Sequence, residues 1–101
     1  MLVWNVRGLN SHARQSVLCQ FVQDHLISIV CIQETKVQLV SSQLIVDACG
    51  SHFSDFISIP SVGLSGGLII AWDDSIVHLE EIASAQNFLL VSCCCRFTGL
   101  T

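Results

Sequence analysis

The first third of the chain carries two short apolar runs separated by one amphipathic stretch. Residues 1–5 (MLVWN) read as a short buried strand. Ser11 can cap a helix over residues 14–25, in which five side chains share one face: Val17, Leu18, Phe21, Val22 and His25. The run at residues 28–33 is continuous and β-branched, as in a strand that is buried on both faces. This strand–helix–strand unit predicts a parallel pair of strands with a crossover helix.

The pattern then changes from helix to strand. A second helix is expected over residues 37–48, where apolar residues are loosely periodic and Gly50 is a natural stop. Four further strands are expected, separated by turn residues such as those of the SVGLSGG loop and the SAQN connection: 53–59, 68–73, 76–82 and 87–97. The chain has no internal repeat and no linker, so the 101 residues fit one domain or part of one.

The composition is too apolar for a free-standing domain of this size. Hydrophobic residues make up 51% and charged residues 12%, whereas an average soluble domain carries roughly 25% charged residues. No apolar run reaches the ~18–20 residues that cross a bilayer, and Asn5 and Arg7 interrupt the N-terminal run before a signal peptide could form. We therefore expect an intracellular protein, in nucleus or cytoplasm, that is neither secreted nor bound to a membrane. We also expect several of its strands to be buried on both faces by partners that this chain lacks.

The charge balance limits the partners. Four Lys and Arg residues stand against eight Asp and Glu, which gives a net charge of −4. The cations are scattered along the sequence, at Arg7, Arg14, Lys36 and Arg96. Because binding to a nucleic-acid backbone relies on clustered cations, this spread argues against an autonomous nucleic-acid clamp. It remains compatible with a divalent cation.

Six cysteines raise the question of metal or redox chemistry. They stand at positions 19, 31, 49, 93, 94 and 95, without a CxxC pair, and three in a row cannot supply the usual zinc spacing. We expect reduced thiols, most of them buried as small hydrophobes. Cys93, Cys94 and Cys95 would then alternate between the two faces of a strand. A redox or zinc module is the alternative.

Two polar residues follow the first two predicted strands. Asn5 ends the first strand and Glu34 follows the second. If these strands are parallel neighbours, both side chains emerge at the carboxyl edge of the sheet, where open α/β folds build their sites. An amide and a carboxylate oxygen are hard ligands that suit Mg²⁺ or Mn²⁺. Alternatively, Asn5 stabilises a turn through the backbone and Glu34 is an acid that favours the start of a helix.

Three segments resemble a known family. WNVRGLN at residues 4–10 and IVCIQETK at residues 29–36 resemble the first two motifs of the endonuclease/exonuclease/phosphatase superfamily, which has the DNase I-like fold. FISIPSVGLSGGLIIAWD at residues 56–73 is similar to the endonuclease domain that opens plant LINE-type (non-LTR) retrotransposon polyproteins. The resemblance implies an α/β (α+β) fold, a partial DNase I-like β-sandwich flanked by helices. Residues 1–101 would be the truncated N-terminal part, the first half of a four-layer fold.

The resemblance also implies roles for individual residues. Asn5 and Glu34 match the residues that bind the catalytic Mg²⁺ or Mn²⁺, so Glu34 would act in catalysis through the metal. Gly8 matches the glycine turn of the first motif, and Gln33 precedes the metal-binding glutamate. The complete domain would bind and nick DNA.

The chain departs from the family in its later motifs. It has no tyrosine and no Asp-x-Asn motif, and none of its histidines stands in a fitting context. Asp73 and Asp74 are better explained as a turn. We therefore expect a fragment of a Mg²⁺-dependent endonuclease that is inactive alone. The alternative is a non-catalytic retroelement remnant that self-associates through exposed apolar sheet.

Overall fold

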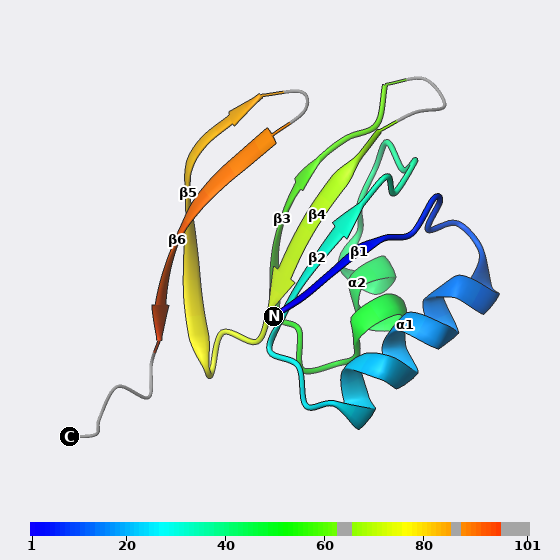
Figure 1. Ribbon diagram of the computed structural model, residues 1–101, viewed down its shortest axis with the longest axis horizontal. Helices are drawn as coiled ribbons and strands as arrows, with labels where there is room; N and C mark the ends of the chain where they lie inside the picture. The colour runs from blue at the N-terminus through cyan, green and yellow to red at the C-terminus, as the bar shows by residue number, and fades with distance from the viewer. Residues whose placement is uncertain (63–65, 86–87, 96–101) are drawn as a thin grey trace.

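The computed structural model describes residues 1–62, 66–85 and 88–95, and the side chains of these except that of Cys95. Parts of the SVGLSGG loop and of the SAQN connection, and the end of the last predicted strand, therefore lie outside the described residues. The elements follow in the order β1 (Leu2–Asn5), α1 (His12–Asp24), β2 (Ile29–Gln33), α2 (Ser42–Cys49), β3 (Asp55–Ile59), β4 (Leu68–Trp72), β5 (Val77–Ala85) and β6 (Phe88–Cys95), as Figure 1 shows. The mixed α/β class that the sequence predicts is confirmed.

The first four strands form one sheet in the order β1-β2-β4-β3. β1 and β2 are parallel, as the strand–helix–strand pattern predicts, and α1 makes the crossover between them. β4 runs antiparallel to both β2 and β3. The last residues of β1 and β2 and the first residue of β4 therefore lie at one edge of the sheet, where Asn5 pairs with Gln33 and Gln33 with Leu68.

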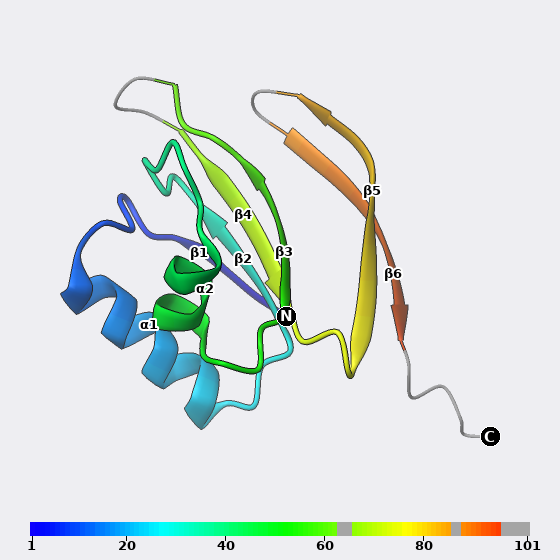
Figure 2. The same ribbon diagram turned by 180° about the vertical axis from the view of Figure 1, so that it is seen from behind.

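The sheet is covered on both faces. α1 and α2 lie on one face of the sheet, and the β5–β6 hairpin lies on the other. Two opposite views show this arrangement (Figures 1 and 2). Val30, Ile32 and Ile69 point into the core beneath the helices, while Ile70 and Trp72 belong to a second core with residues of the hairpin. Two sheets thus pack face to face, and apolar residues on both faces of β2 and β4 account for much of the hydrophobic composition.

The buried face of α1 differs from the predicted one. Ser11 caps the helix as expected, accepting a hydrogen bond from the Arg14 backbone N–H. Leu18 and Val22 are buried, but so is Gln15, whose Nε2 donates to the Leu9 carbonyl at 2.8 Å. Because this hydrogen bond satisfies a buried amide, the helix turns a polar residue inward. The other three residues of the predicted face are exposed: Val17, Phe21 and His25.

The second helix is shorter than the predicted span of residues 37–48. It begins at Ser42, after the N-cap Ser41, and ends before Gly50 as expected. The residues before it are held in a loop, because the Val37 carbonyl accepts a hydrogen bond from the Ser61 backbone at 3.0 Å. The backbone of Lys36 is left-handed, with a φ of 57°. A right-handed helix cannot pass through that conformation.

The expectation that most cysteines are buried is wrong. Among the cysteines whose side chains are described, only Cys49 is buried; Cys19 and Cys31 are half-buried, and Cys93 and Cys94 are exposed free thiols. Cys94 lies on the same face of β6 as the exposed Phe88 and Leu90, which is the outer face of the hairpin. Cys93 lies on the inner face with Leu89 and Val91, and nothing in the structure explains its exposure.

Candidate functional site

The parallel pairing of β1 and β2 brings the two predicted site residues to the same edge. Asn5 pairs with Gln33, and the Val6 backbone N–H donates to the Gln33 carbonyl at 3.0 Å. Glu34 follows Gln33 directly, so its backbone lies beside the first residues after β1. This placement is the one that the strand–helix–strand pattern predicts, and it makes the carboxyl edge of the sheet the candidate site.

The loop that follows β1 is fixed to the loop that follows β2. The Gly8 N–H donates to the Glu34 carbonyl and the Leu9 N–H to the Thr35 carbonyl, both at 2.8 Å. Arg14 closes the turn from the helix side, since its Nη1 donates to the carbonyl oxygens of Arg7 and Gly8 at 2.8 and 3.3 Å. The φ of Gly8 is 112°, a conformation that side chains rarely adopt, which explains the glycine at this position.

The glycine pair before β4 holds the backbone that follows Glu34. The backbone N–H groups of Thr35 and Lys36 donate to the carbonyl oxygens of Gly67 and Gly66, at 3.2 and 2.8 Å. Thr35 is fully buried, and a Cβ at Gly67 would collide with its hydroxyl. Thr35 and Gly67 were not identified from the sequence as site residues. The sequence does contain a signal for them: a glycine pair precedes an apolar strand, and a threonine follows the candidate ligand Glu34.

Glu34 itself adopts an uncommon backbone conformation. Its φ is 54°, in the left-handed region that costs a non-glycine residue of order 1 kcal/mol or more. The hydrogen bonds made by its carbonyl and by the two residues after it hold the backbone in this state. Its side chain is exposed, and in the described part of the chain it makes no hydrogen bond.

The two alternative explanations of these residues do not fit the structure. Glu34 does not begin a helix, because α2 starts only at Ser42. The Asn5 side chain is exposed and makes no hydrogen bond to any described residue, so the turn does not depend on it. The turn is instead held by Arg14 and by backbone hydrogen bonds. Both polar side chains therefore remain available to a ligand.

The donor set fits part of the coordination shell of a hard divalent cation. Mg²⁺ in proteins typically binds one or two carboxylates and keeps several waters or substrate phosphate oxygens. Asn5 and Glu34 supply one amide oxygen and one carboxylate from an exposed edge, which leaves room for the remaining ligands. No group of three or more His, Cys, Asp or Glu residues that could hold a metal occurs in residues 1–62, 66–85 and 88–95. The two residues would thus provide an incomplete site.

The acidic residues after β4 lie at the other edge of the sheet. Asp73 forms the turn that the sequence predicts, since its Oδ1 accepts hydrogen bonds from the Ser75 backbone and hydroxyl. His78 lies within β5, with Nδ1 3.0 Å from Asp74 Oδ1 and Nε2 3.2 Å from Glu80 Oε1. Because β4 is antiparallel to β2, these groups follow the end of β4 that is remote from Glu34.

Two of the thiols are held in their neutral form. Burial raises the pKa of Cys49 to about 12, with a further contribution from the nearby Cys19. Burial also raises the pKa of Cys31. Since the thiolate is the reactive form, neither group is suited to act as a nucleophile or a metal ligand at neutral pH.

Comparisons with known proteins support the fold. No protein-family model and no curated protein matches the chain. Among solved structures, it is similar to the AP endonuclease LMAP from Leishmania major, with 18% sequence identity and a TM-score of 0.56. The match covers 85% of this chain but 31% of that chain, so the present chain spans about a third of the endonuclease. The likeness shows a partial DNase I-like fold. No helix in the described residues is long and apolar enough to cross a membrane.

Proposed function

We propose that residues 1–101 are the N-terminal part of a Mg²⁺- or Mn²⁺-dependent DNA endonuclease domain of the LINE-type retrotransposon kind. Asn5 and Glu34 would supply part of its metal site. The observation that carries the proposal is the parallel β1–β2 pair, which brings these two exposed residues to the same end of neighbouring strands in a fold similar to that of an AP endonuclease. The WNVRGLN and QETK motifs support the same assignment.

In this proposal, the residues of the chain would bind the divalent cation and orient it. Glu34 and Asn5 would hold the cation, and the loops after β1 and β2, joined through Gly8, would fix the separation of the two side chains. A bound divalent metal neutralises charge on a phosphodiester and lowers the pKa of water. Glu34 would thus serve catalysis through the metal alone.

The described residues supply no recognisable general base at this edge. His78 contacts Asp74 in the turn after β4 and Glu80 on the hairpin, and Asp73 forms the turn at the far end of β4. General acid–base catalysis contributes about 10²–10⁴-fold to rate, so we propose that the chain alone does not turn over.

Plasmid nicking tests this function. Supercoiled plasmid, with and without abasic sites, would be incubated with the chain and with Glu34→Ala in Mg²⁺ and in EDTA. We expect neither protein to nick. Nicking that requires both Mg²⁺ and Glu34 would support the site and overturn the proposed inactivity. Nicking that is indifferent to both would contradict the assignment of the site.

A second candidate is a non-catalytic remnant that self-associates through apolar sheet. The outer face of the hairpin and the edge strand favour it, because several large side chains there are about half exposed or more: Val3, Ile82, Phe88 and Leu90. Sedimentation velocity over a range of concentrations separates the two candidates. A monomer at all concentrations contradicts the remnant, whereas dimers that the Val3→Lys variant abolishes would favour it.

A further inference from the structure

The basic residues gather at the candidate site, although they are scattered in the sequence. A Cβ built on Gly8 would lie 3.2 Å from Arg14 Nη1 and 3.8 Å from Lys36 Cδ, and Arg7 is the neighbour of Gly8. The side chains of Arg14 and Lys36 thus lie at Gly8, and Arg7 precedes it in the same turn, while Arg96 lies outside the described residues. The wide spacing of these cations in the sequence therefore does not keep them apart in the fold. The β1–β2 pairing brings together residues that the sequence separates.

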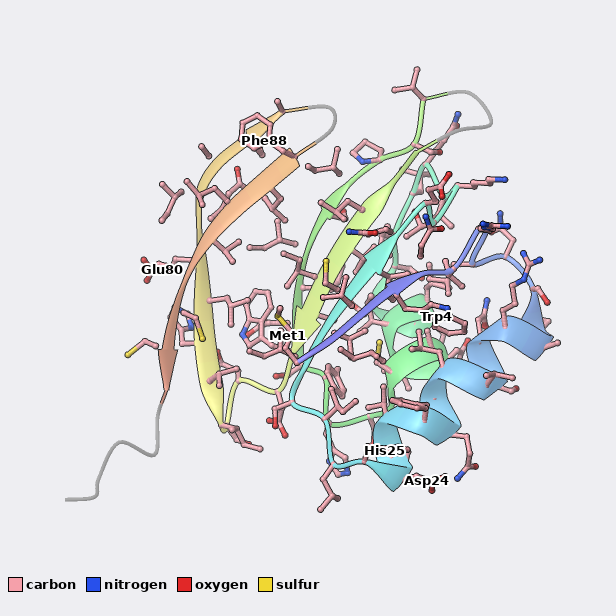
Figure 3. The ribbon with its side chains drawn as sticks, viewed as in Figure 1. Met1, Trp4, Asp24, His25, Glu80 and Phe88 are labelled. Carbon is pink, nitrogen blue, oxygen red and sulfur yellow. The ribbon has the colours of Figure 1, made fainter. Side chains whose placement is uncertain are left out.

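The charges of this cluster, Arg7, Arg14 and Lys36, are not neutralised within the described chain. None of the three forms an ion pair there, and the ion pairs of the described residues involve His78 on the hairpin. Glu34 is the acid of this edge. Figure 3 shows two other acids away from the ends of β1 and β2 that form this edge: Asp24 at the last turn of α1 and Glu80 on the hairpin. An acidic protein therefore has a locally positive surface.

The start of α1 adds to this positive potential. Arg14 lies in the first turn of the helix, which Ser11 caps. The aligned peptide dipoles place a partial positive charge at this end. Arg14 also has a defined position, since its Nη1 donates to the Arg7 and Gly8 carbonyls, and its other nitrogens keep N–H groups for a ligand. The side chain is exposed.

We propose that this basic cluster binds the phosphates of a nucleic-acid backbone, next to the metal site. The choice of a nucleic acid rests on the proposed function, but the cluster itself rests on the geometry around Gly8. Lys and Arg contacts to phosphate supply most of the sequence-independent affinity for nucleic acids and fix the register of the bound strand. The phosphates so held would lie beside Asn5 and Glu34.

Binding without metal tests the cluster by itself. The probe is a fluorescently labelled duplex in EDTA, measured by anisotropy over a range of salt concentrations. We expect Arg7→Gln/Lys36→Gln to bind at least ~10-fold more weakly at low salt and to lower the salt slope by about 1.8, since each phosphate contact contributes about 0.9. The matched control, Ser51→Asp/Ser54→Asp, changes the net charge equally at exposed positions of the opposite edge and should bind like the parent chain.

Further results decide the proposal. Arg14→Lys should retain the affinity that Arg14→Gln loses, because charge rather than shape is required. Inorganic phosphate added to the parent chain should shift the NMR signals of residues 7–9 and 36, a readout that does not depend on a variant folding. Tighter binding of inorganic phosphate than of the duplex would identify a site for free phosphate instead. Equal weakening in the serine control, or an unchanged salt slope in Arg7→Gln/Lys36→Gln, would overturn the cluster. If the parent chain binds the duplex but binds no divalent metal, the result contradicts the proposed function and leaves the phosphate-binding cluster in place.

Discussion

Gly67, just before β4, packs against Thr35 in the loop after β2. This contact helps to hold the backbone next to Glu34. The φ of Gly67 is 95°, and an added Cβ would collide with the Thr35 hydroxyl and lie 3.1 Å from the Lys36 nitrogen. Gly67→Ala should therefore lower the free energy of unfolding by about 2–3 kcal/mol, through backbone strain and the collision together. Chemical denaturation measures this change.

Gly66 provides the control for that substitution. Its φ is also positive, at 78°, but no atom lies within 4 Å of an added Cβ. Gly66→Ala should therefore show the strain alone, at about 1 kcal/mol. Equal effects of the two substitutions would show that the contact with Thr35 does not limit this position.

Cys49 should make the stability depend on alkaline pH. Burial raises its pKa from 9.0 to about 12, while the unfolded thiol titrates near the ordinary value. The stability that the neutral thiol contributes is therefore complete below pH 9 and is lost as the pH rises from 9 toward 12, with a slope of up to ~1.4 kcal/mol per unit. Denaturation at pH 8 and 10.5 should show a smaller loss in Cys49→Ala than in the parent chain, and an unchanged loss in the exposed Cys93→Ala. Identical losses in all three proteins would contradict the assignment to Cys49.

At the scale of residues, the sequence identifies groups whose surroundings are local. Asn5 and Glu34 could be proposed as ligands because they stand at the ends of two apolar strands, each within a motif that resembles the family. Gln15 and Thr35 could not, since their burial depends on a carbonyl and a glycine that belong to other segments of the chain. The helix and strand propensities of a segment contain no information about its contacts with distant segments.

At the scale of elements, the helix starts are set by serine caps. Ser41 Oγ accepts a hydrogen bond from the Leu44 N–H at 3.1 Å, so Ser41→Ala should cost about 1 kcal/mol. Ser42→Ala is the matched control, because Ser42 is an exposed residue of the first turn, outside the cap. Its effect on the free energy of unfolding should lie within ~0.5 kcal/mol of zero. A larger loss for Ser42→Ala than for Ser41→Ala would move the start of α2.

The hairpin is attached to the sheet by its inner face. Leu79 is 4% exposed in the second core, whereas Ile82 on the same strand is 62% exposed. Leu79→Ala should cost about 2–4 kcal/mol, from lost burial and the cavity left behind, and should raise hydrogen exchange in β5 and β6. Ile82→Ala should change the stability by less than ~0.5 kcal/mol. Similar exchange in both variants would mean that the hairpin does not depend on this core.

Strand periodicity identified each strand of the fold, and a parallel β1–β2 pair followed from the crossover helix. The start of α2 and the buried face of α1 were mistaken, because both depend on contacts from other segments. Ser61 holds the Val37 carbonyl in a loop, and Leu9 accepts the hydrogen bond that buries Gln15. Periodicity within one segment carries no information about these partners.

At the scale of the whole molecule, pairing of distant segments changes the meaning of the charge. The chain is acidic overall, with a net charge of −4, but the parallel strands collect Arg7, Arg14 and Lys36 beside Glu34. Net charge predicts the average field of a protein and not where its cations meet. The fold thus places the proposed, incomplete metal site next to basic residues, a combination that would suit a phosphodiester.

Paramagnetic broadening by Mn²⁺ tests the central claim, that the edge after β1 and β2 binds a divalent cation through Asn5 and Glu34. ¹H–¹⁵N spectra of the chain and of Glu34→Gln would be recorded with increasing Mn²⁺. The account predicts selective loss of the signals of residues 5–8 and 34–37 in the parent chain, and their retention in Glu34→Gln at the same Mn²⁺ concentration. Broadening centred on Asp73, Asp74 and Glu80, or broadening around residue 34 that survives Glu34→Gln, would contradict it.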